Sequence, residues 1–503
     1  MLRQLAGQTA IYGISSIVSR LLNYLLTPFL TRIMTTGEYG VITDMYALIP
    51  FAMVVLTMGM ETGYFRFAGK AEGLHGRQEV FSTTWGAVSA VAVLFAALGI
   101  LFTPELSRVM DYPDHPSYIW IVAVVIALDV ITAIPYARLR QENKARLFVI
   151  LRTFSVVLNV VLVVFLYEGL PRLAVGGGWW ASLYDPSYGA GYYLVANLIT
   201  SFVTLLLLFP AYRDCVPRIR WRLLRTIFIY SFPLLVSGVA GVANQFIDRQ
   251  MIKYLMPRGE AMDALGIYGA VAKLGVILLL FIQMYRYAAE PFFLANFKKE
   301  DFLRANAEAL KYFAIVSVAI FLLIMLFADA FALFVGPAFR QGMFILPLIL
   351  LANIFSGMTL NLNFWYKQTG DTRFAIWITG TGLVVTVGLN VWLVPALGYV
   401  GAAWGRLGCE TVMLALSFWL NSRYYPTPYN VRRIGAYFLL GGAIYGISYF
   451  TGMLPAAAKY LLNLGLLTAF AAVAVRWEHI DVRSLARSGP QAVSLHSQTC
   501  RYN

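Results

Sequence analysis

Long apolar runs alternate with short polar segments along almost the whole chain. A helix needs about 20 apolar residues to cross the roughly 30 Å hydrocarbon core of a bilayer. Runs of this length predict about 14 membrane-spanning helices, near residues 9–34, 39–65, 80–103, 117–137, 147–168, 188–211, 226–255, 264–293, 309–334, 342–366, 373–394, 399–420, 434–453 and 456–476. An outer-membrane barrel would show short alternating strands instead. We therefore expect an all-α polytopic membrane protein.

Two connecting segments resemble each other across half the chain. TRIMTTGEYG (31–40) and KYLMPRGEAMDALGIYG (253–269) both lie between apolar runs and both end in Tyr-Gly. Further pairs follow in the same order: RQENKARLF (140–148) with KQTGDTRFA (367–375), Leu-Asn at 158–159 with 389–390, and Gly-Tyr at 191–192 with Gly-Tyr at 398–399. We predict two six-helix lobes related by a pseudo-two-fold axis along the membrane normal, plus two extra C-terminal helices.

This repeat sets the predicted domain organisation. The expected parts are an N-lobe at 1–211, a cytoplasmic linker at 212–225, a C-lobe at 226–421, the extra helices at 434–476 and a disordered cytoplasmic tail at 477–503. Between the first two spans, Gly37 and Gly40 predict a tight turn over Thr35–Gly40. Glu38 is placed to favour the start of the second span through the helix dipole.

Composition and charge support a membrane protein. Hydrophobic residues make up 59% of the chain and charged residues 13%, about half of what a soluble globule carries. The net charge of +14 could indicate nucleic acid, but the basic residues gather in the loops after the even-numbered spans: Arg138, Arg140, Lys144, Arg146, Arg213, Arg218, Arg220, Arg222, Arg225, Lys298, Lys299, Arg304, Arg423, Arg432 and Arg433. This positive-inside pattern predicts cytoplasmic termini, contact with anionic lipid headgroups and no nucleic-acid partner.

Enzyme and metal chemistry are not indicated. Cys215, Cys409 and Cys500 are far apart, without CxxC or Cys/His spacing, so we expect no disulfide framework, metal site or cofactor. The four histidines lie in predicted loops or the tail, and no nucleophile–base arrangement stands out. A glycan polymerase or ligase would be expected to have a large extracytoplasmic loop with acidic residues, and no such loop is predicted.

Charges inside predicted spans are the candidate functional residues, because a charged group at the bilayer centre costs at least about 2.5–3.5 kcal/mol. Arg20 lies near the middle of the first span, with Asn23 on the same face. One interpretation pairs Arg20 with Asp44 or Glu61 of a neighbouring helix. The other, which we favour, places it in a water-filled cavity that admits an anionic ligand.

The second half of the chain has its own set of charges. Asp248 and Arg249 share a face of the seventh span, and Lys253 continues it. In the eighth span, Lys273 has no local acidic partner and is expected in the cavity. Arg286 is four residues from Glu290, and either an ion pair or a cavity position fits. Arg406 and Glu410 are also four apart, and here we expect an ion pair.

The uncompensated intramembrane charges are thus mostly positive and fall in spans one, seven and eight. A cationic cavity between two lobes implies an anionic passenger. The aromatic content of 15% would suit a passenger that also carries sugars, since aromatic rings stack on sugars.

The chain resembles a known family in its opening TAIYGISSIVSRLLNYLLTPFLTRIMTTGEYGVITDMY, in NQFIDRQMIKYL and LGIYGAVAKLGVIL, and in its 6+6+2 organisation. These features look like Wzx-type polysaccharide flippases of the MOP superfamily, alongside the lipid II flippase and the MATE drug exporters. The motifs that carry the resemblance are Glu38-Tyr39-Gly40 and Asp248-Arg249, and it covers nearly the whole chain.

The resemblance implies a multi-pass protein of the bacterial inner membrane that is a transporter and not an enzyme. Such a protein flips an undecaprenyl-pyrophosphate-linked oligosaccharide from the cytoplasmic to the periplasmic leaflet by alternating access. Arg20, Arg249, Lys273 and Arg286 match cavity cations of the family, and with Asn23 they form the expected substrate site. We expect a monomer that works with a glycan polymerase and glycosyltransferases.

Coupling to protons or sodium is a further expectation, with Asp44, Asp129 and Asp248 as candidate carriers. The main alternative is a MATE-like drug or cation exporter, which would have 12 spans and a cavity led by carboxylates. The second alternative is a membrane-bound glycan polymerase or ligase.

Overall fold

The computed structural model describes residues 21–22, 24–215, 218–296, 302–369, 371, 373–450 and 455–479. These residues are almost entirely helical and contain no strand. Among them, nine helices are long and apolar enough to cross a membrane, and ten if one bent pair counts as a single span. Every expected span from the second onward contains a helix, which confirms the all-α polytopic class. The first expected span lies mostly outside the described residues.

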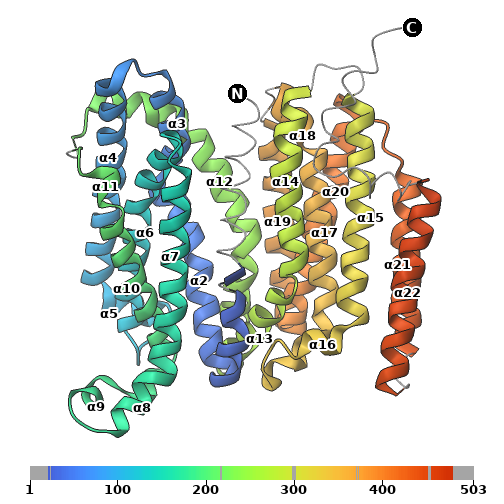
Figure 1. Ribbon diagram of the computed structural model, residues 1–503, viewed down its shortest axis with the longest axis horizontal. Helices are drawn as coiled ribbons and strands as arrows, with labels where there is room; N and C mark the ends of the chain where they lie inside the picture. Colours follow the sequence, from blue (N-terminus) through green and yellow to red (C-terminus); the bar gives the residue numbers. More distant parts are fainter. Residues whose placement is uncertain are drawn as a thin grey trace. The chain divides into compact units, whose positions relative to one another are not determined.

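The chain folds as two compact units (Figure 1). The larger unit comprises residues 1–298 and 332–426, and the smaller one residues 299–331 and 427–503. In the larger unit, the first half comprises α2 to α11. The second half comprises α12 to α14 and, later in the chain, η3 to α20. The smaller unit holds α15 (Phe302–Leu326), α21 (Val431–Phe450) and α22 (Ala456–Trp477), and the short α16 (Ala328–Ala332) follows α15. The predicted lobe boundaries stay a prediction.

The first half contains α2 (Thr36–Thr57), α3 (Met60–Lys70), α4 (Gly73–Leu101), α5 (Thr103–Val109), α6 (Ser117–Gln141), α7 (Ala145–Val164), η1 (Phe165–Gly169), α8 (Leu170–Val175), α9 (Trp179–Leu183), η2 (Pro186–Tyr188), α10 (Gly191–Leu207) and α11 (Phe209–Tyr212). The second half contains α12 (Trp221–Leu255), α13 (Arg258–Leu274), α14 (Val276–Asn296), η3 (Pro337–Ile345), α17 (Leu346–Leu362), α18 (Phe364–Thr369), α19 (Arg373–Leu397) and α20 (Tyr399–Tyr424). Loops 34–35, 110–116 and 256–257 lie at one end of this unit, drawn at the bottom of Figure 1, which we call the outer end.

The start of α2 shows how local sequence fixes a helix end. Thr35 and Glu38 form a capping box: the Glu38 amide donates to the Thr35 hydroxyl over 3.2 Å, and the Thr35 amide donates to the Glu38 carboxylate over 2.8 Å. These bonds satisfy amides that the first helical turn leaves unpaired. The predicted position of Glu38 in the first turn is confirmed. The predicted tight turn over Thr35–Gly40 is wrong, because Gly37 and Gly40 already belong to α2.

The repeated Tyr-Gly segments serve helix packing rather than turning. Tyr39-Gly40 lies on α2 and Tyr268-Gly269 on α13, and these two helices pack against each other at the outer end (Figure 1). A Cβ atom at Gly40 would lie 2.0 Å from the Met262 carbonyl oxygen, and one at Gly269 would lie 2.4 Å from the Thr43 hydroxyl oxygen. The missing side chains therefore let the first and second halves of the larger unit approach to backbone contact.

In the smaller unit, one carboxylate ties three helices together. Glu478, just after α22, forms ion pairs with Lys311 of α15 and Arg433 of α21, at 2.5 and 2.8 Å, and accepts a 3.0 Å hydrogen bond from Tyr437. Burial alone would raise the pKa of Glu478, but these hydrogen bonds and charges outweigh it and hold the pKa below its usual value.

Replacing Glu478 by glutamine is expected to loosen α22. Hydrogen bonds to charged groups contribute about 1.5–3 kcal/mol each, so we expect roughly tenfold faster amide hydrogen exchange in α21 and α22 at pH 7. A carboxylate with a lowered folded pKa stabilises above its unfolded pKa and loses that effect as the pH falls through the folded value. The difference in amide hydrogen exchange between the wild type and the Glu478→Gln variant should therefore shrink under acid conditions. The control is Glu308→Gln, which removes an exposed carboxylate that also pairs with Lys311. This change should alter amide hydrogen exchange little.

Candidate functional site

The predicted site residues are distributed over both halves of the larger unit. Arg20 and Asn23 lie outside the described residues. The two carboxylates considered as partners of Arg20 both contact other cations, Asp44 with Lys253 and Glu61 with Arg140. The remaining candidates lie on α2 (Asp44), α6 (Asp129), α12 (Asp248 and Arg249), α13 (Lys273) and α14 (Arg286).

Asp44 of α2 is the centre of a buried contact with α12. Its side chain is fully buried and forms an ion pair with Lys253, whose side chain is 2% exposed. Gln250 donates to the Oδ1 atom over 2.7 Å, and Tyr112 donates to the Oδ2 atom over 2.6 Å. Both carboxylate oxygens are therefore engaged, and the partners come from both halves.

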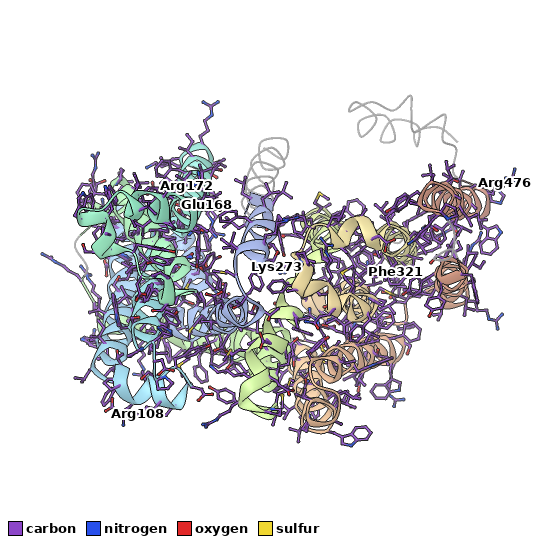
Figure 2. All side chains as sticks on the ribbon, turned by 90° about the horizontal axis from the view of Figure 1, so that it is seen from below. Arg108, Glu168, Arg172, Lys273, Phe321 and Arg476 are labelled. Atoms are coloured by element: carbon purple, nitrogen blue, oxygen red, sulfur yellow. The ribbon has the colours of Figure 1, made fainter. Side chains whose placement is uncertain are left out.

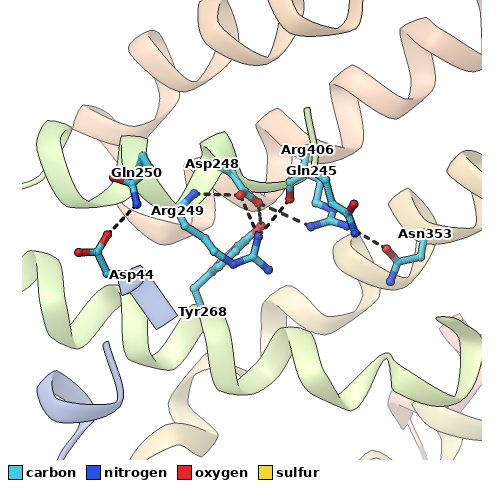
Figure 3. Close-up of polar contacts among 8 residues, drawn as sticks. All are labelled: Asp44, Gln245, Asp248, Arg249, Gln250, Tyr268, Asn353 and Arg406. Carbon is cyan, nitrogen blue, oxygen red and sulfur yellow. Dashed lines mark hydrogen bonds and ion pairs between the residues drawn. The ribbon is translucent and has the colours of Figure 1, made fainter. Parts of the chain in front are cut away.

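Asp248 lies in a second polar network, wholly within the second half (Figure 3). Tyr268 donates to Oδ2 over 2.5 Å, and the backbone amide and the guanidinium of Arg249 reach Oδ1 at 2.8 and 3.2 Å. Arg406 of α20 forms a longer ion pair with Oδ2, at 3.7 Å, and donates to Asn353 of α17 over 3.1 Å. Two guanidinium groups thus surround one buried carboxylate, which links α12, α13, α17 and α20.

This network corrects one pairing. The sequence predicts that Arg406 pairs with Glu410 on its own helix, but its ion-pair partner is Asp248 of α12. Spacing along a helix identifies possible local partners only, and the crossing of α20 with α12 brings a closer one. Arg286 lies on α14, and the side chain of Glu290, its expected partner, is outside the described residues, so that pairing stays a prediction.

Lys273 differs from these cations because no carboxylate pairs with it in the described part of the chain. Its Nζ atom lies 5.2 Å from the centre of the Tyr39 ring of α2, and Tyr193 of α10 and Tyr24 are also in electrostatic contact with it. Figure 2 shows Lys273 among the helices, whereas Arg108 lies on the rim. A cation of the second half is therefore placed against tyrosines of the first.

Beside Lys273, the hydroxyl of Tyr39 is buried, and apart from a weak interaction with Lys273 itself it has no hydrogen-bond partner among the described residues. Buried polar groups are nearly always hydrogen-bonded, so each exception needs an explanation. A lysine ammonium and a tyrosine hydroxyl can both donate hydrogen bonds to an oxyanion. The pair has the chemistry of an anion-binding site.

The backbone next to Lys273 is bent. α13 ends at Leu274 and α14 begins at Val276, and the two helices meet at 54°. Gly275 at the break leaves room for Asn353 and Leu350, which a Cβ atom would approach within 3.5 Å. Broken spanning helices often surround ligand sites in transporters, because the break frees polar backbone groups. The break thus lies next to the unpaired cation.

Asp129 lies in the middle of α6, inside the first half. It accepts a 2.8 Å hydrogen bond from Ser201 of α10 and forms no ion pair in the described residues. Arg152 of α7 and Tyr46 of α2 are in electrostatic contact with it. Of the three carboxylates considered for ion coupling, Asp44 and Asp248 are ion-paired and Asp129 is not.

Sequence reasoning missed two partners. It read Lys253 as the end of a polar face rather than as the partner of Asp44, 209 residues away, and it did not place Tyr39 beside Lys273. The repeated Tyr-Gly pair held a signal for Tyr39, since this residue lies on the packed face of α2. In the described residues, no group of three or more His, Cys, Asp or Glu side chains is placed to hold a metal ion.

Comparison with known proteins identifies the family. Residues 5–296, more than half of the chain, match the family described as "Polysaccharide biosynthesis protein". No curated protein matches the chain. The solved structure of the lipid II flippase MurJ in an inward closed conformation is similar, with a TM-score of 0.73 and 13% identity, covering 94% of this chain and 100% of that one.

Two structures of MATE multidrug transporters of the MOP superfamily share the fold. The inward-facing one has a TM-score of 0.66 and 16% identity, covering 83% of this chain and 95% of that chain. The outward-facing one has a TM-score of 0.55 and 17% identity, covering 86% and 96%. These neighbours are a flippase and transporters, not enzymes. The chain belongs to the polysaccharide biosynthesis protein family and is a multi-pass membrane protein with the fold of MOP-superfamily transporters.

Proposed function

We propose that this protein is a transporter that flips an undecaprenyl-pyrophosphate-linked oligosaccharide from the cytoplasmic to the periplasmic leaflet of a bacterial inner membrane. The observation that carries the proposal is Lys273, a cation without a carboxylate partner in the described residues, beside the buried Tyr39 hydroxyl and a broken helix. The family description, which names polysaccharide biosynthesis, supports the sugar-bearing part of the substrate.

The chemistry of the substrate explains why such a cation is needed. A pyrophosphate has to pass a layer about 30 Å thick in which an isolated charge is costly. Lys273 and Tyr39 would hold the phosphate oxygens by charge-assisted hydrogen bonds. Arg249 forms an ion pair with Asp248. Because a guanidinium has five N–H donors, it can also donate hydrogen bonds to a second anion. Arg20, Asn23 and Arg286 complete the proposed substrate site.

Alternating access between the two predicted lobes is the proposed mechanism. Lys273 of the second half faces Tyr39 of the first, so a bound anion at this point would contact both lobes. The charge pattern of the loops supports cytoplasmic termini, with the outer end toward the periplasm. We propose a monomer that receives the lipid-linked glycan from glycosyltransferases. After flipping, a glycan polymerase would take up the glycan.

A reconstitution assay tests the proposal. The purified protein is placed in vesicles with fluorescently labelled undecaprenyl pyrophosphate bearing a sugar, and a membrane-impermeant quencher reports the labelled lipid that reaches the outer leaflet. We expect faster exchange than in protein-free vesicles. A fluorescent organic cation in the same vesicles tests the MATE-like alternative, since the fold is shared with those exporters. Cation movement without lipid exchange would overturn the proposal.

We further propose Asp129 as the residue that couples transport to protons or sodium, because the alternatives Asp44 and Asp248 are ion-paired. Asp129→Asn keeps the shape of the side chain and removes its charge. The variant is expected to flip lipid at a rate that no longer responds to an imposed proton or sodium gradient. Asp114→Asn, in an exposed loop, is the control and should respond like the wild type. An unchanged gradient response in Asp129→Asn would exclude this role.

A further inference from the structure

We infer that Asp44 and Lys253 form a lock between the two halves at the outer end, which holds the outward path closed and has to break once in each transport cycle. The inference rests on the alternating access proposed above. It adds the contact that must open for release of the passenger.

The lock joins segments that no short connection holds together. Asp44 lies on α2 of the first half and Lys253 near the end of α12 of the second half, 209 residues apart. Tyr112, in the loop before α6, donates a hydrogen bond to the same carboxylate, and its ring lies 4.3 Å from the Lys253 ammonium. Gln250 approaches from α12 (Figure 3). The first half thus contributes two groups and the second half two.

The lock lies on the same helix as a close contact between the halves. About two turns before Asp44 on α2, the Thr36 carbonyl oxygen would lie 1.9 Å from a Cβ atom at Gly266 of α13. The Thr36 hydroxyl also bonds to Asp263 of α13. Both α12 and α13 pack on α2, so separation of α2 from these two helices would part all these groups together. The ion pair therefore lies where an outward opening has to begin.

The energetics suit a lock with two states. With one partner removed, the other charge stays buried and unpaired, which costs several kcal/mol. When the halves separate, water reaches both groups at once and replaces their mutual attraction. The pair is therefore stable when it is closed and dry or fully open and wet, and a half-open state is unfavourable. This is the behaviour expected of a gate.

Distances between spin labels test the inference without any substrate. In a chain with Cys215, Cys409 and Cys500 replaced by serine, labels at Asp114→Cys and Glu260→Cys mark exposed positions of the two halves at the outer end. The closed protein gives one short distance. Asp44→Asn and Lys253→Met are each expected to add a population at longer distance, and the charge reversal Asp44→Lys with Lys253→Asp is expected to restore the short one.

Two further variants keep the test decisive. Gln250→Leu removes one hydrogen bond and no charge, so it folds more readily and should give a smaller shift in the same direction. Glu168→Gln breaks an exposed pair with Arg172, also at the outer end, and should give none. Identical distances in Asp44→Asn, Lys253→Met and the wild type would overturn the lock. If Asp44→Asn and Lys253→Met add the longer distance but the wild-type protein flips no lipid in the vesicle assay, the lock would be retained and the proposed substrate rejected.

Discussion

Replacing Lys273 by methionine is expected to lower the rate of lipid flipping in vesicles by roughly 10- to 100-fold, the factor that corresponds to the loss of a charge-assisted hydrogen bond of about 1.5–3 kcal/mol. Methionine keeps most of the apolar stem of lysine, so the packing against Tyr39 survives. In the described residues Lys273 has no carboxylate partner, so its removal leaves no acid unpaired there. The loss should therefore appear in transport and not in stability.

Two comparisons make this prediction specific. Lys273→Arg keeps the charge and should retain more activity than the methionine variant. Lys70→Met changes an exposed lysine at the end of α3 and should flip lipid like the wild type. Wild-type flipping by a folded Lys273→Met protein would show that this cation does not hold the passenger.

Gly266→Ala is expected to destabilise the crossing of α2 and α13 at the outer end. The added Cβ atom would lie 1.9 Å from the carbonyl oxygen of Thr36 and 2.9 Å from the amide of Gly40. Both are backbone atoms of α2 and cannot move aside as a side chain can. Overpacking of a close contact costs about 1–3 kcal/mol and occasionally more, so we expect a clearly lower melting temperature of the detergent-solubilised protein.

The same helix supplies the control. A Cβ atom at Gly259, in the first turn of α13, would meet no atom within 4 Å. Gly259→Ala should leave the melting temperature close to that of the wild type or raise it slightly, because alanine favours a helix. Equal melting temperatures for the two variants would mean that α2 and α13 do not pack as closely at Gly266 as described above.

The sequence predicted the helices well and their contacts poorly. Apolar runs determine which segments cross a membrane because every backbone polar group must be hydrogen-bonded internally in lipid. The long helices follow those runs, whereas the short helices α5, α8 and α9 lie between them. The position of Glu38 in the first turn of α2 was predicted too, whereas Thr35 was assigned to a turn and its capping role was missed. The glycines at 37 and 40 were misread because a small residue favours a turn and a tight helix crossing alike.

Partners of charges depend on which helices cross, and local spacing contains no such information. Arg406 has Glu410 four residues away, yet it pairs with Asp248 because α20 crosses α12. Asp44 likewise meets Lys253 through packing of α2 on α12. Lys273 could be predicted as unpaired, since no acid lies near it in the sequence. The tyrosines around it could not, since they come from other helices.

The charge of Lys273, which no carboxylate in the described part of the chain neutralises, has an electrical consequence. Moving one elementary charge through a membrane potential of 100 mV changes the free energy by about 2.3 kcal/mol. Arg249 and Lys253 each have a carboxylate beside them, so they contribute little net charge to any movement. A bound pyrophosphate with two negative charges would change the net charge beside Lys273 from positive to negative, whereas the empty protein returns with the positive charge alone. A potential that is negative inside would then draw the empty form back to the side where it loads and would also favour outward movement of the loaded form, so voltage would drive both steps of the cycle in the same direction.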